Sequence, residues 1–109
     1  MPLVSDRQVE DALAILADEE GAAARAAAEY LNDLTKVILS ELMMRSNETS
    51  AAAKEMWARS QPEYREHLIR VGGAAKLDFQ WRQRYSAAAA KIDCWRTEQS
   101  NIRASERVR

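Results

Sequence analysis

The sequence contains one histidine and one cysteine, His67 and Cys94, the two residue types that most often act as nucleophiles, proton carriers or metal ligands. A metal site needs three or four converging ligands, and a histidine-based relay needs a neighbouring nucleophile. If one helix carries both residues, they lie on the order of 40 Å apart at ~1.5 Å per residue. We therefore expect no catalytic residue, no metal site and no cofactor, and we predict that the protein is not an enzyme.

Four acidic or amide side chains fall on the rows of residues that are predicted to pack between helices. They are Glu20, Glu41, Asp78 and Gln99. A buried carboxylate is costly without a partner, so such residues either form a paired-carboxylate site or fix the register of two helices. Exposure at widened parts of the packing row, or ion pairs with arginines, is the simpler interpretation. Both interpretations stay open at the level of sequence.

Tryptophans alternate with arginines in the second half of the chain, a composition that gives stacking faces and phosphate contacts in nucleic-acid binders. The candidate residues for contact with a partner protein or with nucleic acid are Trp57, Arg59, Tyr64, Arg82, Arg84, Trp95, Arg96 and Arg103. Aromatic residues at helical spacing belong more often to a core, and Glu66, Asp78 and Glu98 dilute the basic charge. A protein partner is therefore the preferred reading.

A long helix must position most of these residues, because apolar or semi-polar side chains recur at alternating spacings of three and four over residues 61–103. This row comprises Tyr64, His67, Val71, Ala74, Asp78, Trp81, Tyr85, Ala88, Ile92, Trp95, Gln99 and Ile102. A similar row predicts a first long helix over residues 6–45, and it comprises Val9, Leu13, Leu16, Glu20, Ala23, Ala27, Tyr30, Leu34, Val37, Glu41 and Met44. Leu31, Ile38 and Leu42 widen this row of the first helix.

Local signals divide the chain further. The acidic run before Gly21 predicts a kink or a break near residues 18–21, because glycine weakens a helix interior. A polar linker precedes a short helix over residues 50–59. Ser60 and Glu63 have the spacing of a capping box, with Pro62 in the first turn of the second long helix. After Arg103 the row ends, so we expect residues 104–109 to fray.

The predicted fold is all-α, a single domain over residues 1–109 built as a long, coiled-coil-like antiparallel hairpin with a short connecting helix. Residues 1–50 carry four basic and ten acidic groups, whereas residues 51–109 carry twelve basic and seven acidic ones, which favours pairing of the two halves. Apolar side chains beside the main rows predict a dimer in the form of a four-helix bundle. They are Leu31, Ile38 and Leu42 in the first helix and Leu68, Leu77 and Phe79 in the second.

The single cysteine favours a reducing compartment, and the sequence contains neither a signal-peptide run nor an apolar segment of membrane-spanning length. We expect a soluble cytoplasmic protein with no membrane partner.

From residue 29 onward the chain resembles a group of short, helical, uncharacterised proteins encoded by tailed bacteriophages and prophages. The segments that carry the resemblance are 51–55, 57–64 and 92–97, together with Arg103. The resemblance implies a phage accessory protein in the cytoplasm of a bacterial host, from a genomic region devoted to early or DNA-recombination functions.

The function expected from these observations is that of a non-enzymatic interaction protein. We expect it to bind a phage or host protein that acts on DNA, in recombination or in host-nuclease and defence modulation. The alternative is binding of single-stranded nucleic acid by the arginine-rich C-terminal helix. Salt dependence distinguishes the two, because phosphate binding weakens steeply with salt.

Overall fold

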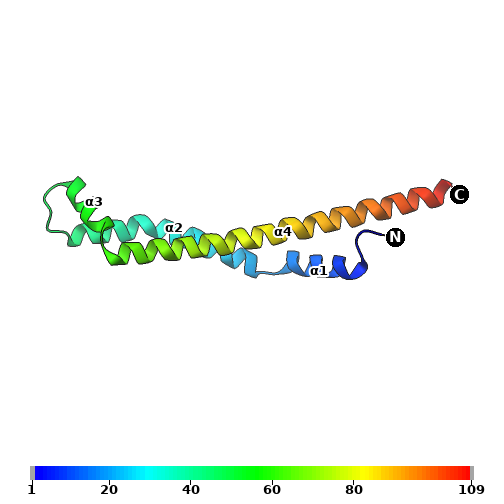
Figure 1. Ribbon diagram of the computed structural model, residues 1–109, viewed down its shortest axis with the longest axis horizontal. Coiled ribbons are helices and arrows are strands. Elements are labelled where there is room, and N and C mark those ends of the chain that lie inside the picture. The colour runs from blue at the N-terminus through cyan, green and yellow to red at the C-terminus, as the bar shows by residue number, and fades with distance from the viewer. Residues whose placement is uncertain (1, 109) are drawn as a thin grey trace. The chain divides into compact units, whose positions relative to one another are not determined.

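The structure is a computed structural model that describes residues 2–108. Over these residues the chain forms α1 (Asp6–Ala17), α2 (Glu20–Arg45), α3 (Ala51–Arg59) and α4 (Pro62–Val108) (Figure 1). Residues 2–108 contain no β-strand, so the prediction of an all-α fold is confirmed. The longest helix, α4, has 47 residues.

Packing divides the helices into two compact units. Unit 1 comprises residues 2–21 and 80–108, and unit 2 comprises residues 22–79. Unit 1 therefore contains α1 and the second part of α4, while unit 2 contains most of α2, all of α3 and the first part of α4. Each unit buries a small core of its own.

Short polar side chains cap the N-terminal ends of α1 and α2. Ser5 Oγ accepts a hydrogen bond from the Gln8 backbone N–H at 3.2 Å, and the Gln8 side chain accepts from the Ser5 N–H at 2.8 Å, which forms a capping box at α1. Asp18 is extended, and its Oδ1 accepts from the Glu20 N–H at 2.9 Å, so the same residue follows α1 and caps α2. The break lies within residues 18–21, where the sequence predicts a kink or a break.

Unit 1 is held by small side chains between α1 and α4. Ala12, Ala88 and Ile92 form its buried cluster, and Ile15 packs against it. Alanines at these positions let the two helix backbones approach closely. The backbone N–H of Leu3 donates to Glu98 at 2.6 Å, which ties the segment before α1 to α4.

Unit 2 is an antiparallel pair of α2 and α4, with α3 packed at the end where they connect (Figure 1). Leu42, Ala58 and Tyr64 form its buried cluster, and Trp57 packs against this cluster from α3. Farther along the pair, buried His67 makes a 2.9 Å hydrogen bond through Nε2 with Thr35 Oγ1. This bond satisfies a polar atom that burial would otherwise leave unpaired.

The prediction of which side of α4 packs is confirmed by the burial of its side chains. The buried members of the predicted row are Tyr64, His67, Asp78, Trp81, Ala88 and Ile92. Val71, Ala74, Tyr85, Trp95 and Gln99 are half-buried, and only Ile102 at the end of the row is exposed.

The row predicted to pack in the first helix is wrong for α2 and for most of α1. In α1, Leu13 and Leu16 are exposed by 52% and 42%, and the packed residues are Ala12 and Ile15. Tyr30, Val37 and Met44 are exposed by 63%, 49% and 85%, respectively. The packed side of α2 is the neighbouring row, which comprises Ala24, Ala28, Leu31, Thr35, Ile38 and Leu42. Both rows have spacings of three and four, so periodicity alone does not separate them. The side chains that α3 and α4 present decide, since Thr35 is opposite His67 and Leu42 meets Tyr64.

The capping box predicted at Ser60 is also wrong. Ser60 has the helical conformation (φ −84°, ψ −8°) and follows α3, so its Oγ turns back and donates to the Trp57 carbonyl at 2.6 Å. An N-cap side chain needs an extended residue to reach forward. The carbonyl of Gln61 instead accepts the first backbone hydrogen bonds of α4, which begins at Pro62.

The C-terminal part of α4 differs from the expectation as well. The helix continues beyond Arg103 to Val108. Residues 104–108 contain no glycine or proline and are exposed, so the helix persists there on backbone hydrogen bonds after its packing row has ended. Residue 109 lies outside the described residues.

The true N-cap of α3 gives a direct test of these assignments. Ser50→Ala is expected to lower the free energy of unfolding by about 1 kcal/mol, because the Ala53 N–H loses its 3.1 Å bond to Ser50 Oγ. Ser60→Ala is the matched control, and we expect a smaller loss because Ser60 caps no helix N-terminus. Urea denaturation of the three proteins measures both values, and a larger loss for Ser60→Ala would reverse the assignment.

Candidate functional site

The sequence-predicted candidates do not form one site, because they fall into the two units. Trp57, Arg59 and Tyr64 belong to unit 2. Tyr64 is buried and Trp57 is half-buried against the core, so neither offers an open stacking face. These aromatic side chains hold α3 against the start of α4.

Arg59 stabilises the same contact between α3 and the start of α4. Its Nε and Nη2 donate to Glu55 at 3.1 and 2.7 Å, and its Nη1 donates to the Tyr64 hydroxyl at 3.2 Å. The guanidinium carbon lies 5.7 Å from the centre of the Tyr64 ring. The hydrogen bonds to Glu55, with a smaller contribution from Tyr64, raise the pKa of Arg59 above its ordinary value. An arginine side chain is charged in any case, and three of the five N–H donors of Arg59 are occupied within the chain.

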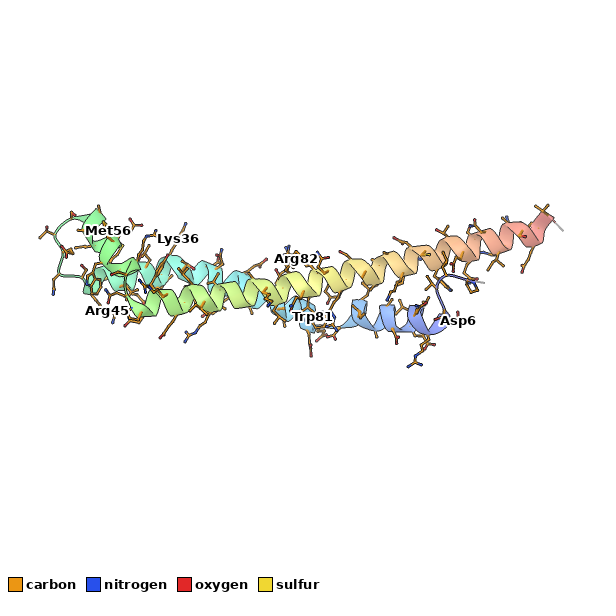
Figure 2. The ribbon with its side chains drawn as sticks, viewed as in Figure 1. Asp6, Lys36, Arg45, Met56, Trp81 and Arg82 are labelled. Atoms are coloured by element: carbon orange, nitrogen blue, oxygen red, sulfur yellow. The ribbon has the colours of Figure 1, made fainter. Side chains whose placement is uncertain are left out.

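The other five candidates lie on the part of α4 in unit 1. The Arg84 guanidinium lies 4.8 Å from the ring centre of the buried Trp81, and Figure 2 shows Trp81 and Arg82 leaving α4 on different sides. Trp95 is half-buried, and its Nε1 is buried with no acceptor among residues 2–108. Arg96 is exposed. Exposed Arg103 donates to the Gln99 carbonyl at 3.4 Å.

The polar residues of the predicted packing rows do not converge. Glu20 and Glu41 are exposed, Gln99 is half-buried, and Asp78 is buried. Within residues 2–108 no three His, Cys, Asp or Glu side chains are grouped to hold a metal ion. The exposure of Glu20 and Glu41 is the simpler of the two outcomes that the sequence left open.

The break between α1 and α2 contains a contact that the sequence did not reveal. The Tyr85 hydroxyl donates to the Asp18 carbonyl at 2.6 Å, and the ring of Tyr85 lies directly against Gly21. A Cβ atom at Gly21 would overlap that ring. Gly21 is therefore required by a tertiary contact, whereas its sequence neighbours indicated only a weak point in a helix.

Unit 2 contains a groove of about 670 Å³ between α2 and the start of α4. Its lining residues are Ile38, Glu41, Leu42, Met44, Arg45, Glu63, Glu66, His67 and Arg70. At its edge Arg45 Nη2 donates to Glu63 Oε2 at 2.6 Å, near the end of α2 marked by Arg45 in Figure 2. The sequence missed this surface because it assigned Val37 and Met44 to the core.

Exposed apolar side chains continue the groove along α2. Tyr30, Val37 and Met44 follow one another at intervals of seven, so they share one side of the helix. Half-buried Leu34 lies between Tyr30 and Val37 on this side, and exposed Glu41 lies between Val37 and Met44, so the row mixes apolar and charged side chains. We call this surface, formed by the groove and these three side chains, the α2 face.

Comparison with protein-family models, with curated proteins and with solved structures finds no match. Within residues 2–108, no helix combines the length and the apolar character that crossing a lipid bilayer requires.

Proposed function

We propose that the protein is a non-enzymatic interaction protein and that its α2 face binds an amphipathic helix of a phage or host protein. The exposed row on α2 carries the proposal, because Tyr30, Val37 and Met44 leave 63%, 49% and 85% of their surface, respectively, open to solvent. An amphipathic helix that docks in a groove uses apolar anchors at the same spacing.

The charges at the groove indicate the chemistry of that partner. Arg45 and Glu63 neutralise each other, whereas Glu41, Glu66 and Arg70 enter no ion pair among residues 2–108. Two unpaired carboxylates against one guanidinium leave the groove acidic, so a helix with basic flanks is complementary to it. Proteins that act on DNA carry such basic segments. This supports a partner in recombination or in host-nuclease and defence modulation, within the cytoplasm of a bacterial host.

The alternative function, binding of single-stranded nucleic acid through α4, has less support. Base stacking needs open aromatic faces. Phe79 on α4 is 56% exposed, but it was not among the candidates for stacking. Of the candidates, Trp57 and Trp95 are half-buried, Tyr64 is buried, and Arg84 lies over the ring of Trp81.

The test is affinity purification from phage-infected cells with and without nuclease, followed by direct binding of the purified partner. We expect a captured protein that survives nuclease and binds the wild-type chain, with Met44→Glu weakening its binding at least tenfold. A negative charge at Met44 disrupts an apolar contact while leaving the intrachain core untouched, because Met44 is 85% exposed.

Met56→Glu is the matched control, since Met56 on α3 is also an exposed methionine but lies outside the α2 face. We expect it to bind the partner as the wild type does. Loss of all captured material on nuclease treatment would favour the nucleic-acid alternative, and equal binding by Met44→Glu would exclude the α2 face.

We also propose that the chain self-associates. Of the side chains expected at the bundle interface, Leu42 is buried within its own chain and Leu31 and Ile38 are half-buried, so α2 offers less free apolar surface than the sequence indicated. The apolar side chains of α4 remain available for self-association.

A further inference from the structure

The part of α4 in unit 2 presents large apolar side chains to solvent on the sides that do not meet α2. Leu68, Ile69, Leu77 and Phe79 are all exposed, and Ile69 reaches 74%. At about 100° per residue, Leu68 and Phe79 share one side of the helix and Leu77 lies on the other. Ile69, the most exposed of the four, lies between them on the side opposite Val71.

A glycine pair, Gly72 and Gly73, follows Ile69 at a distance of about one helical turn, and Gly73 lies on the same side of α4 as Ile69. Glycine is the least favourable helix-interior residue after proline, so a pair of glycines in α4 calls for a packing reason. Gly21 has such a reason in the ring of Tyr85, but a Cβ atom on Gly72 or Gly73 would meet nothing within 4 Å. No side chain of residues 2–108 fills the space that the two missing side chains leave.

The charges beside the glycines are suited to a second copy of the same helix. Glu66 and Lys76 lie five residues before and five residues after Val71. They are about 15 Å apart along the helix at ~1.5 Å per residue, so they cannot pair with each other. Among residues 2–108 neither of them enters an ion pair.

We propose that two copies of the chain bind each other through antiparallel α4 helices, related by a twofold axis at the level of Val71. This register places Ile69 over the partner's Gly73 and, by symmetry, Gly73 under the partner's Ile69. It also places Glu66 beside the partner's Lys76, twice in each dimer. A twofold interface of this kind is self-complementary, because the apolar knob and its gap, and both charges, come from one helix.

This interface is distinct from the proposed binding of another protein on the α2 face, and either can exist without the other. Glu66 also lines the groove of the α2 face, so a substitution at Glu66 can affect both interfaces. For this reason its effect is measured on self-association and not on binding of the other protein. Met44→Glu is expected to leave self-association unchanged.

A charge swap tests the proposed register by sedimentation velocity over a series of protein concentrations. E66K and K76E are each expected to raise the dissociation constant of the dimer severalfold, because each leaves like charges opposed. The double variant E66K/K76E restores both pairs and is expected to return the constant toward that of the wild type. Failure of the double variant to recover over the single variants would overturn the register.

Gly73→Leu tests the gap itself. Leucine is the better helix former, so circular dichroism is expected to show undiminished helix, while the side chain fills the space for Ile69 and weakens the dimer at least tenfold. Unchanged association of Gly73→Leu, or a wild-type chain that is monomeric at hundreds of micromolar, would refute the proposal.

Crosslinking provides a readout that does not depend on affinity. With Cys94 replaced by serine, chains carrying Ile69→Cys are mixed with chains carrying Gly73→Cys and oxidised. The proposed contact brings these positions within disulfide reach, so the mixed dimer should dominate over crosslinks of Ile69→Cys to a control Gln80→Cys chain. Equal yields for the two mixtures would contradict the contact.

Discussion

Leu42→Ala is expected to lower the free energy of unfolding by about 3 kcal/mol, within the range of about 2–5 kcal/mol for truncating a buried leucine. Leu42 is 2% exposed and meets Ala58 and Tyr64, so its side chain lies where α2, α3 and α4 come together. Removing three carbon atoms there leaves a cavity that three helices would have to close at once. Chemical denaturation followed by circular dichroism measures the change.

Met44→Ala is the control for Leu42→Ala, because it truncates an apolar side chain of α2 that is 85% exposed. We expect a change within about 0.5 kcal/mol, as for most surface substitutions. The pair of variants also decides which row of α2 packs. If Met44→Ala were the more destabilising, the row predicted from the sequence would be the core after all.

Gly21→Val is expected to destabilise the protein by about 2 kcal/mol. The new side chain collides with the Tyr85 ring, and overpacking of this kind typically costs about 1–3 kcal/mol. Displacing the ring also breaks the 2.6 Å hydrogen bond from Tyr85 to the Asp18 carbonyl. The better helix propensity of valine offsets only a few tenths of a kcal/mol.

A double-mutant cycle separates the collision from other effects of the glycine. In a Tyr85→Ala background the ring is absent, so Gly21→Val should be close to neutral. Gly72→Ala, measured at a concentration at which the chain is monomeric, should stabilise the helix, because a Cβ there meets open space. Equal losses for Gly21→Val with and without the Tyr85 ring would show that the contact does not account for Gly21.

The helical class and the packed side of α4 were readable from the sequence, because one row from Tyr64 to Gln99 was clearly the most apolar line on that helix. The break near Gly21 was indicated by its acidic run. For α2 two adjacent rows were equally periodic, and the choice depended on residues far away in sequence, such as His67 opposite Thr35. A local pattern does not contain that information.

The candidate site was less predictable than the fold. Trp57 and Tyr64 were named as contact residues because aromatic side chains next to arginines are suited to base stacking. The structure instead shows these side chains packing α3 against the start of α4. Ser60 had the spacing of an N-cap but the conformation of a C-cap, and spacing alone does not report conformation. The α2 face was hidden because the exposed row, with Tyr30 and Met44, looked like a core.

The discontinuity of unit 1 has a consequence for how the chain folds as it leaves the ribosome. Leu3 and Glu98, which bond to each other, are 95 positions apart, whereas unit 2 is one continuous segment. Synthesis at about 5–20 residues per second leaves α1 waiting on the order of 10 s before the second part of α4 is made. Unit 2 can form in that interval, while the apolar side of α1 stays open to chaperones and proteases. Closure of unit 1 is then the last step, and the loop it closes is already shortened by folded unit 2.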